Sequence, residues 1–244
     1  MAKFAVVIPA AGKAERFGGS ENKTFAKMGG RPVFLRSVEQ FIHRKDVCQT
    51  ILAVAPEDMS TMKSSYGANL GFLNVTLVEG GARRCDSVAA ALEVIAEEAE
   101  YVAIHDAARP CVTTEMIDRV FAEAVKSGAA ILAVPITGTL KRVSESKVID
   151  GTESRTGLYE AQTPQVFRKD IILDAFERLQ GSAVDVTDDA QVVEMAGHPV
   201  SIVDSDPTNL KVTAKSDMVL GNAILKARPA KAVPRLGAFE EAQW

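Results

Sequence analysis

The chain has 244 residues, of which 47% are apolar and 25% charged, and its net charge at pH 7 is −4. These values are average for a globular protein, so they exclude a mostly disordered or fibrous chain. No basic stripe stands out, which argues against nucleic acid as a partner, and no apolar run approaches the roughly 20 residues that cross a bilayer, so we expect no membrane association. The start of the chain has no secretory cleavage pattern, and three widely spaced cysteines suggest reduced thiols. We therefore expect a cytoplasmic protein.

Short β-branched runs alternate with helical patterns over the first 135 residues. The expected strands are 4–8, 50–54, 74–78, 101–104 and 130–134, and the expected helices are 32–43, 86–96 and about 114–126. Thr113 or Thr114 can cap the last of these helices, and Gly128 follows its end. This order predicts an α/β fold with a mainly parallel sheet and helices on both faces. Continuous apolar runs such as AVVI are typical of strands that are buried on both faces.

The alternating pattern stops after Pro135. Residues 138–161 are polar and rich in turn formers, with Val143 and Val148 flanking a polar turn. We expect a projecting hairpin here, with strands near Leu140–Val143 and Lys147–Asp150. The pattern then resumes, and the further elements expected are helices at 169–179, 187–195 and 214–226 and a strand at 200–203. Residues 1–226 should thus form one domain that carries a β-arm at about 138–161, and residues 227–244 a loosely ordered tail.

The turn after the first strand reads IPAAGKAERFGG and is followed closely by Lys23. In open α/β sheets ligands bind beyond the carboxyl ends of the strands. Small residues there let backbone N–H groups approach phosphates, and Arg16 and Lys23 can balance the charge. The turn lacks two common phosphate motifs, because Ala14 replaces a glycine of the dinucleotide fingerprint and Phe17 replaces a glycine of the P-loop. An ordinary loop with surface charges remains an equal alternative for this segment alone.

Two further clusters follow expected strands. GGARRCDSV leads into the helix at 86–96, and its glycines permit close approach of a base or ribose, although Asp86 or Ser87 could simply begin the helix. IHDAARP ends the strand at 101–104, where Asp106 could hold Mg²⁺ against phosphate oxygens. The alternative is a structural turn in which Asp106 pairs with Arg109.

Taken together, these clusters resemble the 2-C-methyl-D-erythritol 4-phosphate cytidylyltransferase family of the non-mevalonate isoprenoid pathway. The segments that carry the resemblance lie between residues 6 and 217 in the family's order: IPAAGKAERFGGSENKTF, GGARRCDSV, HDAARP, TGTLKRV, TPQVF, VTDDA and TNLKVT. HDAARP and TPQVF are specific, whereas PAAG is shared with many sugar nucleotidylyltransferases. The chain departs from the family at Ala14, where a glycine is usual, and at 22–24, where Asn-Lys-Thr replaces Pro-Lys-Gln.

The resemblance implies a Rossmann-like fold of the nucleotide-diphospho-sugar transferase type and the conversion of CTP and 2-C-methyl-D-erythritol 4-phosphate to CDP-methylerythritol and pyrophosphate. It also implies Mg²⁺ or a similar divalent cation, placed by Asp106, and a homodimer formed through the β-arm. Arg16 and Lys23 match the family's catalytic residues. The residues that match its nucleotide site are Ala10, Ala11, Gly12, Gly81, Ser87, Asp106 and Arg109. Those that match its site for the acceptor phosphate are Thr139, Arg155, Thr163 and Lys211.

Three alternatives stay open on the sequence. The acceptor could be another polyol phosphate such as ribitol 5-phosphate, the nucleotide could be UTP or GTP with a sugar phosphate, or the chain could bind a nucleotide without catalysis. The expected chemistry needs no general base, because a phosphate monoester has a second pKa of about 6 and is mostly a dianion at neutral pH. The lack of a recognisable Ser-His-Asp or Cys-His set therefore agrees with nucleotidyl transfer.

Overall fold

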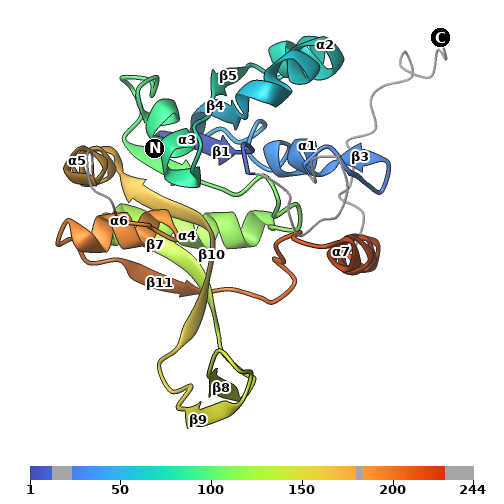
Figure 1. Ribbon diagram of the computed structural model, residues 1–244. Helices are drawn as coiled ribbons and strands as arrows, with labels where there is room; N and C mark the ends of the chain where they lie inside the picture. Colours follow the sequence, from blue (N-terminus) through green and yellow to red (C-terminus); the bar gives the residue numbers. More distant parts are fainter. Residues whose placement is uncertain (13–23, 180–183, 229–244) are drawn as a thin grey trace.

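A seven-stranded sheet forms the centre of the protein (Figure 1). The computed structural model describes residues 1–12, 24–179 and 184–228, and within them the strand order is β11-β7-β10-β6-β1-β4-β5. The strands are β1 (Phe4–Pro9), β4 (Val47–Val54), β5 (Val75–Glu79), β6 (Tyr101–Ile104), β7 (Ala129–Pro135), β10 (Tyr159–Arg168) and β11 (Ser201–Asp204). All neighbours pair in parallel except β10, which runs antiparallel between β6 and β7. The prediction of a mainly parallel sheet is confirmed.

Helices cover both faces of this sheet, also as predicted. One face carries α1 (Val33–Val38), α2 (Pro56–Phe72) and α4 (Thr114–Ser127), and the other carries α3 (Arg84–Leu92), α5 (Lys169–Leu179) and α6 (Asp189–Met195). A further helix, α7 (Lys215–Ala227), packs beside the short hairpin of β2 (Lys27–Met28) and β3 (Arg31–Pro32). Side chains alternate along β1, so Phe4 and Val6 enter one core while Val7 enters the other. This two-sided burial explains the continuous apolar strands.

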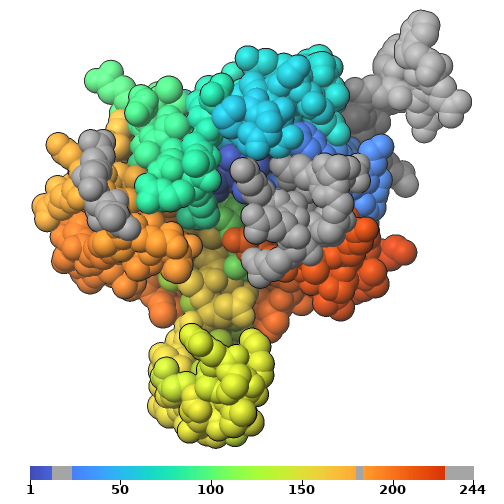
Figure 2. Space-filling model, viewed as in Figure 1, coloured from blue at the N-terminus to red at the C-terminus, as the bar shows by residue number. Residues whose placement is uncertain are grey.

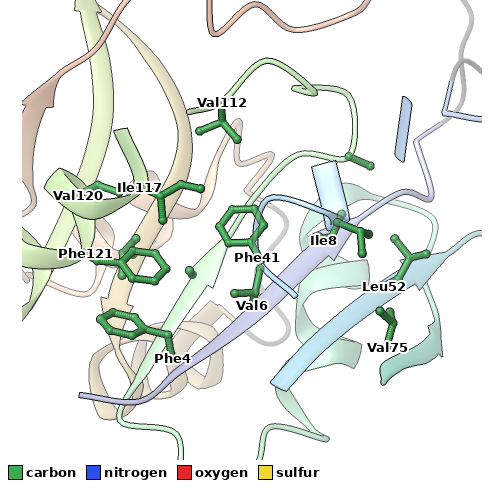
Figure 3. Close-up of a cluster of buried hydrophobic side chains, with 14 of the residues drawn as sticks. Phe4, Val6, Ile8, Phe41, Leu52, Val75, Val112, Ile117, Val120 and Phe121 are labelled. Carbon is green, nitrogen blue, oxygen red and sulfur yellow. The ribbon is translucent and has the colours of Figure 1, made fainter. Parts of the chain in front are cut away.

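Helix α4 shows how local sequence and packing agree. Thr113 caps its start by accepting the N–H of Met116 at 3.2 Å, and Gly128 ends it in the left-handed conformation with φ 86°. Its apolar side faces the sheet, where the ring of Phe121 stacks on Phe4 with 3.9 Å between centroids (Figure 3). The predicted cap and stop are both confirmed.

Four elements were not predicted, namely α2, β10 and the short strands β2 and β3, and the helices expected over 32–43 and 86–96 end earlier than expected. Helix α2 has only Met62 and Leu70 fully buried, so its sequence lacks a strong apolar stripe. Strand β10 was missed because it carries buried polar residues and Pro164, which has no N–H for the ladder. The helix expected over 32–43 ends at Val38, after which turns with i to i+3 bonds continue the chain. No helix in the described ranges is long and apolar enough to span a bilayer.

The projecting hairpin is present and stands out from the body of the molecule (Figures 1 and 2). Its strands β8 (Leu140–Val143) and β9 (Ile149–Glu153) pair only with each other. The second strand begins two residues later than predicted, because Ser144 accepts and donates the hydrogen bonds that close a turn reaching Val148. The loosely ordered tail was predicted for residues 227–244, most of which lie outside the described residues. That prediction and the predicted domain boundary at residue 226 therefore remain predictions.

The cap of α4 gives a test of the fold. Thr113→Ala removes the side-chain acceptor at the helix start and should lower the free energy of unfolding by about 1 kcal/mol, measured by urea denaturation. Thr114→Ala is the matched control, since Thr113 alone accepts the Met116 N–H. Equal losses from both variants would show that the cap does not stabilise α4.

Candidate active site at the carboxyl edge of the sheet

Two small-residue turns lie against each other at the ends of β1 and β5. Ala10 donates its N–H to a carbonyl of β4 at 2.7 Å, and Gly80 donates to the last carbonyl of β4 at 2.8 Å. A Cβ built on Gly80 would lie 2.8 Å from both Ala11 Cβ and Ser87 Oγ. Glycine is therefore required at position 80 if the turns are to pack this closely.

The second turn is held by residues of the helix that follows it. Ser87 Oγ accepts the N–H of Gly81 at 3.1 Å, and Asp86 accepts the N–H of Arg83 at 3.0 Å. Asp86 thus stabilises the start of the helix, as the alternative interpretation of this cluster expected. Ser87 stabilises the turn itself. The structure brings together four of the predicted nucleotide-site residues, Ala10, Ala11, Gly81 and Ser87, and Gly12 follows Ala11 in the first turn.

A buried carboxylate lies beside these turns, at the end of β6. Asp106 contacts Arg84 Nε at 3.0 Å and Lys211 Nζ at 2.7 Å through different oxygens, and Arg109 Nε lies 3.8 Å away. Burial favours the neutral acid, but the three cations outweigh it and hold the pKa of Asp106 well below its usual range. The predicted residues Asp106, Arg109, Thr163 and Lys211 all line one cavity of about 210 Å³. This cavity is suited to an anion, because Arg84, Arg109 and Lys211 outnumber the carboxylates of Asp106 and Asp188 in its lining.

Arg84, which is not among the predicted site residues, connects the cavity to helix α6. Its Nη1 lies 2.7 Å from Asp189, whose pKa burial raises above the ordinary value despite this partner. Gln165 fixes the same helix start by accepting the N–H groups of Asp189 and Ala190 and donating to Asp188. Arg84 stands within the recognised GGARRCDSV segment, but nothing local indicates that it pairs with an acid of another helix.

Strand β10 and the loop after β11 complete the cavity. Thr163 Oγ1 accepts the N–H of Asp106 at 3.0 Å, and Asn209 donates to the Thr163 carbonyl at 3.0 Å. Arg109 donates to the Asn209 carbonyl at 2.7 Å and also gives its N–H to the Asp106 carbonyl. The structural turn between Asp106 and Arg109, considered above as an alternative, therefore exists within the cavity wall.

The other predicted site residues lie elsewhere. Thr139 and Arg155 are exposed at the base of the arm, where Arg155 donates to the carbonyl of Thr137, and neither lines the cavity around Asp106. Arg16 and Lys23 lie outside the described residues. A larger hollow of about 1260 Å³ runs along α1 and α7, but neither Asp106 nor the cations that contact it line this hollow.

The residues present fit a metal ion that arrives with a nucleotide. Within residues 1–12, 24–179 and 184–228 no three His, Cys, Asp or Glu side chains gather closely enough to hold an ion alone. Asp106 supplies one carboxylate, and Mg²⁺ commonly binds through one or two carboxylates together with substrate phosphates.

Comparison with known proteins agrees with this geometry. The family model for 2-C-methyl-D-erythritol 4-phosphate cytidylyltransferase (IspD) matches residues 4–227. The chain belongs to this family. It is 44% identical to the cytidylyltransferase of that name from Rhodopirellula baltica over 237 residues, which cover 92% of this chain and 95% of the relative. Its fold matches the crystal structure of the enzyme from Thermus thermophilus with a TM-score of 0.77 and 30% identity, covering 92% and 99% of the two chains. The predicted family, fold and nucleotidyltransferase activity are confirmed.

The contact at Gly80 gives a test of the nucleotide turns. Gly80→Ala places a Cβ against Ala11 and Ser87, and overpacking of this kind costs about 1–3 kcal/mol. If the turns bind CTP, its Kd should rise about tenfold or more, measured by calorimetry. Gly67→Ala in α2 is the control, because a Cβ there meets no atom within 4 Å. Unchanged CTP affinity in Gly80→Ala would separate the turns from the nucleotide.

Proposed function

We propose that CTP binds on the turns at Ala10–Gly12 and Gly80–Ser87, and that the phosphate of 2-C-methyl-D-erythritol 4-phosphate binds at the cavity around Asp106. The observation that supports this proposal most directly is that the Arg84 side chain extends from the second turn to the cavity. Arg84 begins the helix that follows this turn and contacts Asp106 in the cavity. The two halves of the site thus adjoin, as a direct transfer between the substrates requires.

The reaction is an in-line displacement. An oxygen of the acceptor phosphate bonds to the α-phosphorus of CTP while the bond to pyrophosphate breaks. The acceptor is a dianion at neutral pH and needs no base, so the main obstacle is repulsion between two anions. Arg84, Arg109 and Lys211 are already gathered at the cavity and offset that repulsion in the transition state. Arg16 and Lys23 are assigned to the charge that develops at the α-phosphorus, on their match to the family motif.

Mg²⁺ is proposed as the cofactor, carried in by the triphosphate. It would neutralise phosphate charge, and Asp106 is the residue that would help to hold it. The cations that now contact Asp106 would then turn toward the acceptor phosphate. Their positive charge would then balance the acceptor phosphate, because a bound ion would balance charge on the nucleotide side.

We also propose a homodimer assembled through the β-arm. The arm and its base expose Val143, Val148, Ile149, Leu158 and Tyr159. A two-stranded hairpin is marginally stable in water, and exposed apolar clusters mark contact surfaces. A second copy related by twofold symmetry would cover the arm. Arg155, at the arm's base, would then reach the acceptor site of the partner.

A cytoplasmic location is proposed as well. All three cysteines, Cys48, Cys85 and Cys111, are free thiols in the structure. Unpaired cysteines are typical of a reducing compartment.

Pyrophosphate release tests the substrates and the metal together. With CTP and Mg²⁺, we expect turnover with methylerythritol phosphate to exceed turnover with ribitol 5-phosphate, and UTP and GTP to be poor replacements for CTP. EDTA should abolish activity, and added Mg²⁺ should restore it. Faster turnover of ribitol 5-phosphate would assign the chain to that acceptor, and full activity in EDTA would contradict the role of the metal.

Mixing two inactive variants tests the shared site. Lys23→Ala and Arg155→Ala should each be inactive alone. When they are combined and allowed to exchange subunits, activity should partly return, because one site of each heterodimer carries neither substitution.

The same measurement on each variant alone, at the same total concentration, is the control. Confirmed subunit exchange without recovered activity, or sedimentation as a monomer, would overturn the shared site.

A further inference from the structure

His105 lies beneath the acceptor cavity and is absent from the predicted site. Its side chain is completely buried and packs beside Phe41, with 5.2 Å between ring centroids. Both ring nitrogens meet polar atoms: Nδ1 lies 3.1 Å from Thr163 Oγ1, and Nε2 lies 3.1 Å from the carbonyl oxygen of Arg109. The ring therefore joins strand β10 to the turn that carries Asp106 and Arg109.

The partners of the ring determine where its proton resides. A carbonyl oxygen can only accept, so Nε2 must carry a hydrogen to bond with Arg109. The opposite tautomer would set two lone pairs against each other in a buried place, which is costly. Complete burial, with no carboxylate of the described residues bonded to either ring nitrogen, also disfavours a doubly protonated and therefore charged ring. Nδ1 is then an acceptor, and the hydroxyl of Thr163 must donate to it.

The donor and acceptor roles of the Thr163 hydroxyl can be assigned in the same way. A hydroxyl has one proton and two lone pairs. The proton goes to His105, and one lone pair accepts the N–H of Asp106 at 3.0 Å. Only a lone pair remains for the cavity, so this hydroxyl cannot donate to an anion.

We propose that His105, fixed as the Nε2–H tautomer, is a positioning residue that orients Thr163 toward Asp106 and holds the turn from Asp106 to Arg109 in place for the acceptor phosphate. It follows that Thr163 serves the acceptor site by orienting Asp106, and that the donors to the phosphate are cationic side chains. His105 is fully buried and touches no substrate. The inference rests on the proposed acceptor site, but its first test is independent of activity.

The tautomer is measured directly by ¹⁵N NMR of the histidine rings at neutral pH. The protein has three histidines, and His43→Gln and His198→Gln identify His105 by elimination without disturbing the buried ring. We expect His105 to show a protonated Nε2 and an unprotonated Nδ1. A protonated Nδ1, alone or together with Nε2, would overturn the proposal whatever the substrate proves to be.

Steady-state kinetics test the positioning role. His105→Leu removes both the donor to the Arg109 carbonyl and the acceptor for Thr163, whereas His105→Gln keeps an N–H and a carbonyl oxygen and should rescue part of the loss. For His105→Leu we expect KM for the acceptor to rise about tenfold, with KM for CTP nearly unchanged and the far-ultraviolet spectrum native. His198→Leu, a matched change at a partly exposed histidine, should leave both constants unchanged. A rise in KM for CTP equal to that for the acceptor would refute a local role.

A double-mutant cycle separates positioning from direct phosphate binding. Thr163→Val removes the hydroxyl, and if its proton serves His105, the double variant Thr163→Val/His105→Leu should raise the acceptor KM by less than the two single effects combined. Additive losses would show that Thr163 donates to the acceptor independently of His105. Wild-type values in His105→Leu would show that the ring only fills space.

Discussion

The buried carboxylate of Asp106 is the constraint on which the site depends. A carboxylate removed from water costs several kcal/mol unless cations and hydrogen bonds compensate. Compensation comes from Arg84 at the start of α3, Arg109 in the turn after β6 and Lys211 in the loop after β11. Three segments far apart in the sequence must therefore converge before Asp106 can be buried. The folded protein then holds three cations together at the cavity before any ligand binds.

The sheet makes that convergence possible. Parallel strands bring the turns after β1, β5 and β6 to one edge, because their carboxyl ends share it. Strand β10 has a different task. It runs from the arm past the end of β6, with Gln165 paired opposite Ile104, so an antiparallel strand joins the arm to the cavity wall. Thr163 lies only four positions after Tyr159 at the arm's base. A single strand thus connects the base of the arm to the wall of the Asp106 cavity.

The features that sequence could predict are those with a local cause. The apolar run of β1 and the cap and stop of α4 at Thr113 and Gly128 depend on neighbours in the chain, and they were found. The small-residue clusters at strand ends were found for the same reason. Helix α2 was not, because only Met62 and Leu70 are fully buried along it. The ion pair of Arg84 with Asp189 and the hydrogen bond between His105 and Thr163 join residues far apart in the sequence. No local sequence pattern could therefore predict them.

The proposed reaction needs no general base, and this agrees with the direction of the hydrogen bonds around Asp106. A base is needed where a proton must leave the nucleophile, and a phosphate dianion has none to lose. The groups around Asp106 instead form a directed series, in which the Asp106 N–H bonds to Thr163, the Thr163 hydroxyl to His105, and the His105 ring to the Arg109 carbonyl. Every proton in that series is used within the protein.

Arg84 Nη2 and Arg109 Nε, by contrast, have no hydrogen-bond partner among the described residues. These N–H groups belong to cations that line the cavity, and a buried donor gains most from an anionic acceptor. The neutral groups therefore hold the wall in one orientation, and the unpaired guanidinium donors are the groups that the proposed site assigns to the phosphate.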